Sequence, residues 1–289
     1  MRVHPRHVAF ALLGAAALAV TGPTGAQTIH QRVEVIYTPL GGSIAAAQDE
    51  TSGNSPGDLR DILADLRGPR YEGRAAAGTF GDVGTSVGLL TSFGQFHTIA
   101  ATTEILGDPV FVNPLGIPVR VSSDFIIDGG RLWVIGGEGS FASFRMELYR
   151  GTPLGGVTDL RFTTSGRLQV DANGDAAFAA AGADIGAGMD GSNSVRIPLS
   201  FQTADLGILG PGEALSLFYT LGVTAGTGQF GEIVRAEFSD PFDVSGSGIL
   251  GTIRFAPAVP AVVPEPNTLA LLGGGALLLL GVARRRRGR

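Results

Sequence analysis

The sequence predicts a mainly β fold, an antiparallel β-sandwich with one short helix, lying between two apolar terminal segments. Apolar and polar residues alternate over several short segments, and the longest alternation covers residues 215–223. Glycine accounts for 45 of the 289 residues without a three-residue period, which excludes collagen and is typical of many short strands joined by tight turns. The chain has no cysteine, so its stability must come from a hydrophobic core rather than from disulfides.

The first 26 residues have the organisation of a secretory signal peptide. Arg2 and Arg6 supply positive charge, residues 8–20 form an apolar helix, and Thr24-Gly25-Ala26 offers small residues for cleavage. Thirteen apolar residues are too few to span a bilayer. We therefore expect the mature chain to begin near Gln27.

A β-rich ectodomain is expected at residues 27–255, followed by a Pro-rich linker at residues 256–263. Residues 41–55 are predicted to be a loop, and residues 181–194 either a long glycine-rich loop or a seam between two domains. The predicted strands cover residues 32–38, 93–99, 119–121, 144–148, 215–223, 234–238 and 249–255.

Two β-hairpins and one helix complete the expected ectodomain. The hairpins cover residues 125–135, with a turn at Asp128-Gly129-Gly130, and residues 167–178. The helix is predicted to begin with Ser55 as its N-cap and to end at Gly68-Pro69. Its apolar side chains recur at helical spacing and form one stripe, which we expect to pack on the sheet: Leu59, Ile62, Leu63 and Leu66.

Three local patterns suggest chemistry, and each has a simpler explanation. Ser86 lies in a G-x-S-x-G pattern, but no helix follows it and only His97 lies downstream. His97 fits a half-exposed sheet position. Asp171, Asn173 and Asp175 have the spacing that begins a calcium loop, although a turn between two strands explains them equally. We predict no catalytic residues, no cofactor and no metal centre, and hence a protein that is not an enzyme.

Charge bears on the partners of the ectodomain. Residues 27–263 contain 14 arginines and 25 acidic residues, which gives a net charge of −11. An acidic surface repels nucleic acid and anionic lipid, so neither is expected as a partner.

The C-terminal 26 residues contain three elements in a fixed order. Pro264, Glu265 and Pro266 form a carboxylate held in extended backbone by two prolines. Residues 268–283 form an apolar transmembrane helix of about 24 Å, which is short against a hydrocarbon core of about 30 Å. A cationic cluster follows, which is expected to stay in the cytoplasm: Arg284, Arg285, Arg286 and Arg287.

This arrangement resembles the PEP-CTERM sorting signal of Gram-negative bacteria. The resemblance implies that an exosortase, a membrane enzyme similar to a transpeptidase, recognises Pro264-Glu265-Pro266 and removes the helix. It also implies a transient stay in the inner membrane and delivery to the cell surface or to an extracellular polysaccharide matrix. An ordinary membrane anchor preceded by prolines is the alternative.

The sequence thus predicts an exported surface or matrix protein with a structural or adhesive ectodomain. A glycan-binding module and a secreted hydrolase are the alternatives. Aromatic side chains exposed on one sheet face would favour the first alternative. Paired carboxylates in a pocket, or contact between Ser86 and His97, would favour the second.

Overall fold

The structure is a computed structural model that describes residues 28–39, 43–54, 60–77, 83–90, 97–151, 159–227, 233–239 and 253–258. The described residues form seventeen strands and no helix, and all the pairs are antiparallel. The mainly β, antiparallel prediction is therefore confirmed. The expected signal peptide and the expected transmembrane helix at residues 268–283 lie outside the described residues. In the described part of the chain, no helix combines the length and hydrophobicity needed to cross a membrane.

Three sheets contain these strands, and we call them sheets A, B and C. Sheet A has the order β11 (Ala176–Gly182), β10 (Asp159–Val170), β9 (Phe141–Arg150), β15 (Ala214–Thr227), β6 (His97–Val112), β1 (Thr28–Pro39) and β2 (Ala45–Gly53). Sheet B has the order β12 (Gly188–Met189), β13 (Ser194–Ile197), β8 (Gly129–Ile135), β16 (Ile233–Ser239), β5 (Val83–Leu90), β4 (Tyr71–Ala77) and β3 (Ile62–Gly68). Sheet C is short, with the order β14 (Ser200–Leu209), β7 (Val119–Ile127) and β17 (Ile253–Pro257).

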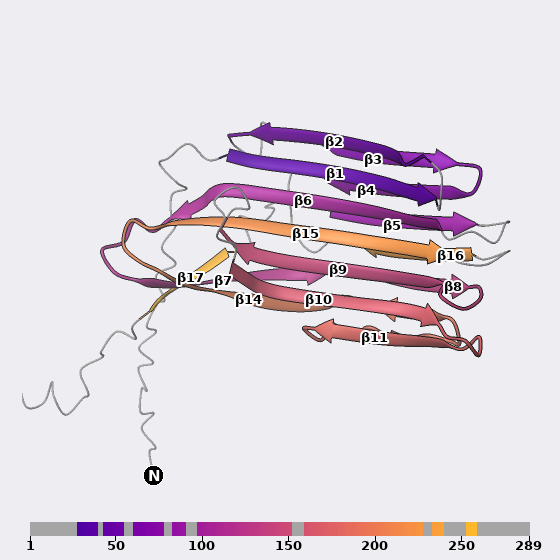
Figure 1. The fold of residues 1–289 in the computed structure, drawn as a ribbon. Coiled ribbons are helices and arrows are strands. Elements are labelled where there is room, and N and C mark those ends of the chain that lie inside the picture. Colours follow the sequence, from indigo (N-terminus) through magenta and orange to yellow (C-terminus); the bar gives the residue numbers. More distant parts are fainter. Residues whose placement is uncertain are drawn as a thin grey trace, which may run out of the picture.

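Sheets A and B form the two layers of a sandwich. Figure 1 shows sheet A in front, from β2 at the top to β11 at the bottom, with β3, β4, β5, β16 and β8 behind it. Sheet C lies at one end, near the loops that join β6 to β7 and β14 to β15 (Figure 1). Alternate side chains of each strand therefore face either the layer between sheets A and B or one of the two outer faces.

The core consists of the inward-facing residues of this alternation. Leu217, Leu221 and Val223 of the predicted strand in sheet A are at most 1 % exposed, so the period-two prediction for β15 is confirmed. Phe144 of sheet A and Phe238 of sheet B stack across the interior with ring centroids 4.9 Å apart. Burial of each large apolar side chain stabilises the fold by about 1.5–3 kcal/mol. The sheets are therefore held together mainly by this layer.

The helix expected from Ser55 to Gly68 is wrong over the part that the structure describes, because Ile62–Gly68 form strand β3. Ile62 and Ala64 are buried, whereas Leu63 is 44 % exposed, which is the alternation of a strand and not a helical stripe. Pairing with β4 across a two-residue turn satisfies the backbone of β3. The apolar pattern of this segment fits both the helical and the strand period, and pairing with β4 selects the strand. Residues 55–59 lie outside the described residues.

Two further local expectations are corrected. Residues 41–55 were expected to be a loop, but Ala45–Gly53 form edge strand β2, paired with β1. Residues 125–135 do not form a hairpin, because β7 belongs to sheet C and β8 to sheet B. Gly129 lies where the chain passes from one sheet to the other, with φ of +129°. A Cβ there would lie 2.9 Å from the carbonyl oxygen of Ile197, so glycine is required by both its backbone and its surroundings.

The hairpin at residues 167–178 is confirmed, since β10 pairs with β11 and Val170 lies opposite Ala176. The glycine-rich segment at residues 181–194 does not separate the strands before it from those after it. Strand β9 precedes the segment and pairs with β15, which follows it, in the middle of sheet A.

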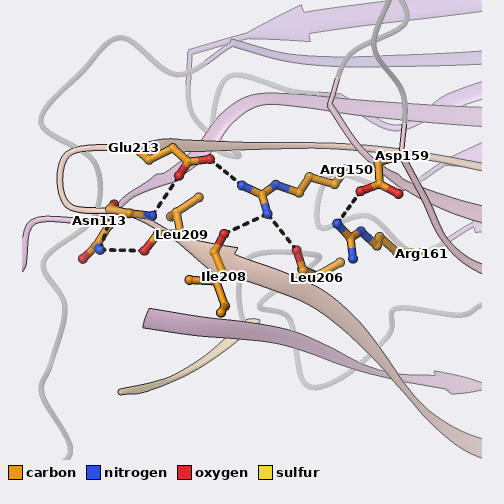
Figure 2. Close-up of polar contacts among 9 residues, drawn as sticks. Asn113, Arg150, Asp159, Arg161, Leu206, Ile208, Leu209 and Glu213 are labelled. Carbon is orange, nitrogen blue, oxygen red and sulfur yellow. Dashed lines mark hydrogen bonds and ion pairs between the residues drawn. The ribbon is translucent and has the colours of Figure 1, made fainter. Parts of the chain in front are cut away.

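Aromatic and polar contacts join sheet C to sheet A, and Phe111 of β6 lies against Phe255 of β17 with ring centroids 3.9 Å apart. Phe125 of β7 and Phe162 of β10 meet edge to face, with ring centroids 4.8 Å apart. Figure 2 shows the polar contact, in which the guanidinium of Arg150 in β9 donates to the carbonyl oxygens of Leu206 and Ile208 in β14. These bonds, 3.2 and 3.0 Å long, hold β14 beside the end of β9.

Asn113 connects the loop after β6 to the end of β14 and the loop that follows it, at the end of the molecule where sheet C lies (Figure 2). Its side chain is completely buried, and its Nδ2 donates to the carbonyl oxygens of Ile117, Leu209 and Gly210. Its Oδ1 accepts from the amide of Leu115 at 3.0 Å. One amide side chain thus joins the loop after β6 to the loop after β14.

Candidate functional site

The sorting residues of the C-terminal segment, Pro264, Glu265, Pro266 and the cluster Arg284–Arg287, lie outside the described residues. The described chain ends just after β17. Its last residue, Ala258, donates its amide to the carbonyl oxygen of Pro118 at 3.0 Å. The segment that carries the motif therefore continues from the end of the molecule where sheet C lies.

Ser86 and His97 occupy different sheets. Ser86 lies within strand β5, opposite Arg74 and Glu237, and not on a turn between a strand and a helix. His97 begins β6 in sheet A, is half-buried as expected, and its Nδ1 lies 2.7 Å from the hydroxyl oxygen of Tyr37. The structure therefore does not bring together the serine and histidine that a nucleophile elbow requires.

A small aromatic cluster surrounds His97. The ring of Tyr37 stacks on Tyr71 with centroids 3.9 Å apart and an interplanar angle of 16°. Burial, together with the positive charge of Arg70, lowers the pKa of His97. Burial and then the charge of Tyr71 raise the pKa of the Tyr37 hydroxyl. The cluster links β1 of sheet A to β4 of sheet B as a packing contact, and the lowered pKa of His97 favours its neutral imidazole.

Asp171, Asn173 and Asp175 form the turn between β10 and β11. Oδ1 of Asp171 accepts from the backbone amides of Asn173 and Asp175 at 2.8 and 2.9 Å. These donors lower the pKa of Asp171. Among the described residues, no group of three or more histidine, cysteine or acidic side chains is placed to hold a metal ion.

Aromatic side chains lie partly exposed on the outer face of sheet A. Tyr149 of β9 and Phe218 of β15 are neighbours across the two strands, with ring centroids 5.9 Å apart. Phe141 lies farther along β9, covered by the guanidinium of Arg167 at 3.7 Å. The pair Tyr149 and Phe218 is the aromatic surface that glycan binding on this sheet would use.

The outer face of sheet B carries a set of arginines that sequence reasoning did not single out. Four of them are exposed, and none forms an ion pair with a carboxylate of the described residues. We call them the arginine face: Arg74, Arg131, Arg196 and Arg235. Trp133 is half-buried on the same face, opposite Arg235 on the neighbouring strand.

A hollow lies next to this face, where β4 and β16 begin. It has a volume of about 310 Å³, and its lining includes Arg67, Arg70, Tyr71 and Arg235. Gly88 also lines it and lies opposite Arg235, so the absence of a side chain at residue 88 leaves this space open. The hollow is cationic and continuous with the arginine face through Arg235.

Comparison with known proteins gives one family assignment, and it concerns the C-terminal segment. No curated protein matches the chain. One solved structure is 10 % identical to this chain, and the match covers 73 % of this chain and 85 % of the other. It is described as the structural basis for the promiscuous specificity of the carbohydrate-binding modules from the β-sandwich superfamily. Its TM-score is 0.17, so it carries no argument about this fold or its ligand. Residues 262–287 match the family model of the PEP-CTERM protein-sorting motif, and the chain therefore carries that motif.

Proposed function

We propose that the chain is an exported precursor that an exosortase-like membrane enzyme recognises at Pro264, Glu265 and Pro266. The enzyme cleaves near this tripeptide, the apolar helix is removed, and the β-sandwich is delivered to the cell surface or to the extracellular matrix. The match of residues 262–287 to the sorting motif is the observation that carries this proposal. The sandwich then has a structural or adhesive role and no catalytic one.

The fold supports a role outside the cell in physical terms. The chain contains no cysteine, and its two large sheets are closed by a continuous apolar layer. Such a domain needs neither a disulfide nor a metal to stay folded after export. An antiparallel sandwich also presents two broad outer faces, which suit contact with a polymer better than the binding of a small substrate.

Intact-mass spectrometry of the protein recovered from its native cell surface tests the sorting step. The expected species lacks residues 1–26 and ends near Pro264–Asn267. Replacing Glu265 by alanine removes the carboxylate between the prolines, and the variant is expected to retain residues 268–289.

Pro260→Ala provides the matched control, because it alters a proline of the linker outside the tripeptide. It should be processed like the wild type. If wild-type protein from the cell surface retains residues 268–289, the cleavage step is wrong and the chain is a membrane-anchored ectodomain.

A glycan-binding module remains the second candidate function. The partly exposed pair Tyr149 and Phe218 on the outer face of sheet A favours it. Aromatic rings offer apolar faces on which sugar rings stack. Truncation of either ring to alanine should weaken the retention of the protein by its matrix if this face binds glycan.

A further inference from the structure

We propose that the arginine face of sheet B binds an acidic polysaccharide, through carboxylates carried along an extended sugar chain. This inference rests on the proposed adhesive role and names the chemical class of polymer that the ectodomain would hold. It comes from the distribution of ion pairs over the surface, from the sheet order, and from the hollow where β4 and β16 begin.

The ion pairs are unevenly distributed. Eight of the fourteen arginines between residues 27 and 263 lie within 4.0 Å of a carboxylate that the structure describes: Arg32, Arg60, Arg67, Arg120, Arg145, Arg150, Arg161 and Arg254. The four members of the arginine face have no such partner among the described residues, although residues 27–263 carry a net charge of −11. Asp65 lies opposite Arg74 on the same face but pairs with Arg67. Guanidinium groups without an ion pair to a described carboxylate are complementary to an anionic ligand.

The register places two of these cations directly opposite each other. Arg196 of β13 is the cross-strand partner of Arg131 in β8. Like charges at opposite positions of an antiparallel pair destabilise the sheet. Glu237 lies opposite Arg131 on its other side but forms no ion pair with it. An anion bound between Arg131 and Arg196 would relieve this repulsion.

The arginine face is long in the direction across the strands. Its members lie on β13, β8, β16 and β4, and β5 lies between the last two. Four steps at about 4.8 Å each give a length of roughly 19 Å. A line of cations of this length suits a polymer with repeated carboxylates better than one small anion.

Trp133 and the hollow favour carbohydrate among the possible polyanions. The half-buried ring of Trp133 lies beside Arg235, so a sugar could stack on the indole while its carboxylate meets the guanidinium. From Arg235 the hollow of about 310 Å³ continues toward Arg70, with Glu72 in its lining as a hydrogen-bond acceptor for hydroxyl groups.

The test uses the full chain purified in detergent, with polygalacturonate as the probe, in isothermal titration calorimetry at about 150 mM salt. Its methyl-esterified form, which has the same sugars without the charge, should give no heat. The triple variant Arg131→Gln, Arg196→Gln and Arg235→Gln is expected to bind at least about tenfold more weakly.

A second triple variant controls for the change of net charge. Arg32→Gln, Arg120→Gln and Arg254→Gln remove the same number of charges from ion-paired arginines of sheets A and C, of which Arg32 is half-buried and the other two are exposed. It should bind within about twofold of the wild type, a loss far smaller than one decade of affinity. Circular dichroism checks that both variants are folded.

Four outcomes would overturn the inference. They are equal losses in the two triple variants, equal binding of the esterified polymer, equal binding of single-stranded DNA, and no heat at all. Light scattering without ligand tests whether a second copy of the chain occupies this face instead. A wild-type dimer that is lost only in the variant of Arg131, Arg196 and Arg235 would show that these arginines contact a second copy. Binding to purified protein does not depend on sorting, so a failed mass measurement and a failed titration can be told apart.

Discussion

Replacement of Asn113 by alanine should destabilise the protein more than most single substitutions. The side chain is completely buried, and Nδ2 donates to the carbonyl oxygens of Ile117, Leu209 and Gly210 at 3.0, 3.1 and 3.0 Å. Oδ1 accepts from the amide of Leu115 at 3.0 Å. The substitution removes all these side-chain bonds, whereas the backbone bonds of residue 113 to Glu213 and Gly212 remain.

The magnitude follows from the number of bonds and from their burial. Each lost hydrogen bond costs about 1 kcal/mol net, and a buried group left without a partner costs about 1–3 kcal/mol. The carbonyl oxygen of Leu209 accepts a buried bond, whereas those of Ile117 and Gly210 lie where water can reach them. We therefore expect the free energy of unfolding to fall by about 2–4 kcal/mol. For a domain of this size, that corresponds to a decrease in Tm of roughly 4–16 °C.

Urea unfolding followed by the fluorescence of Trp133, the single tryptophan, measures this change. Asn173→Ala is the matched control, since the Asn173 side chain is exposed and reaches only Asp171 at 3.5 Å. The control should change the free energy by less than about 0.5 kcal/mol. If Asn113→Ala also changes the free energy of unfolding by less than this, at an unchanged m-value, the stabilising role of the Asn113 side chain is refuted.

Two further predictions concern backbone geometry and pH. Gly130→Ala should lower the free energy of unfolding by about 1–3 kcal/mol, because its Cβ would lie 2.3 Å from the backbone oxygen of Glu237. Gly188→Ala should leave the free energy of unfolding unchanged, because no atom lies within 4 Å of its Cβ. Similar urea midpoints for the two variants would contradict this reasoning. The pKa of Asp171 is lowered by backbone amides, so its stabilising effect is present above the ordinary value of 3.8 and is lost as pH falls through the lowered pKa. The difference in Tm between wild type and Asp171→Ala should therefore shrink below pH 3.8, and a constant difference down to pH 2 would count against it.

The parts of the fold that depend on local pattern could be predicted from the sequence. Strand β15 alternates from Leu215 to Val223, and the hairpin at residues 167–178 needs only two adjacent strands and an Asp-x-Asn-Gly turn. The apolar residues of Ile62–Gly68 fit both the helical period and the strand period, and only pairing with β4 decides between them. Similarly, nothing near Gly129 indicates that β7 and β8 enter different sheets.

The sorting motif and the arginine face differ in how far the sequence alone can predict them. The sorting motif is contiguous, so its residues are recognisable without any structure. The arginine face gathers residues as far apart as Arg74 and Arg235. Alternation predicts that Arg131 and Trp133 share one side of their strand, but only the sheet order places them beside Arg196 and Arg235. No spacing rule along the chain contains that information.

In the proposed precursor, the bond between Ala258 and Pro118 would also limit how far the folded domain can move from the processing enzyme. Six residues of chain lead from Ala258 to Pro264, and even fully extended they reach only about 22 Å. While Pro264 is held at the membrane, the end of the sandwich that carries sheet C must stay within that distance of the enzyme. The length of chain after Ala258 therefore limits the distance between this end of the domain and the enzyme, whatever the orientation of the domain.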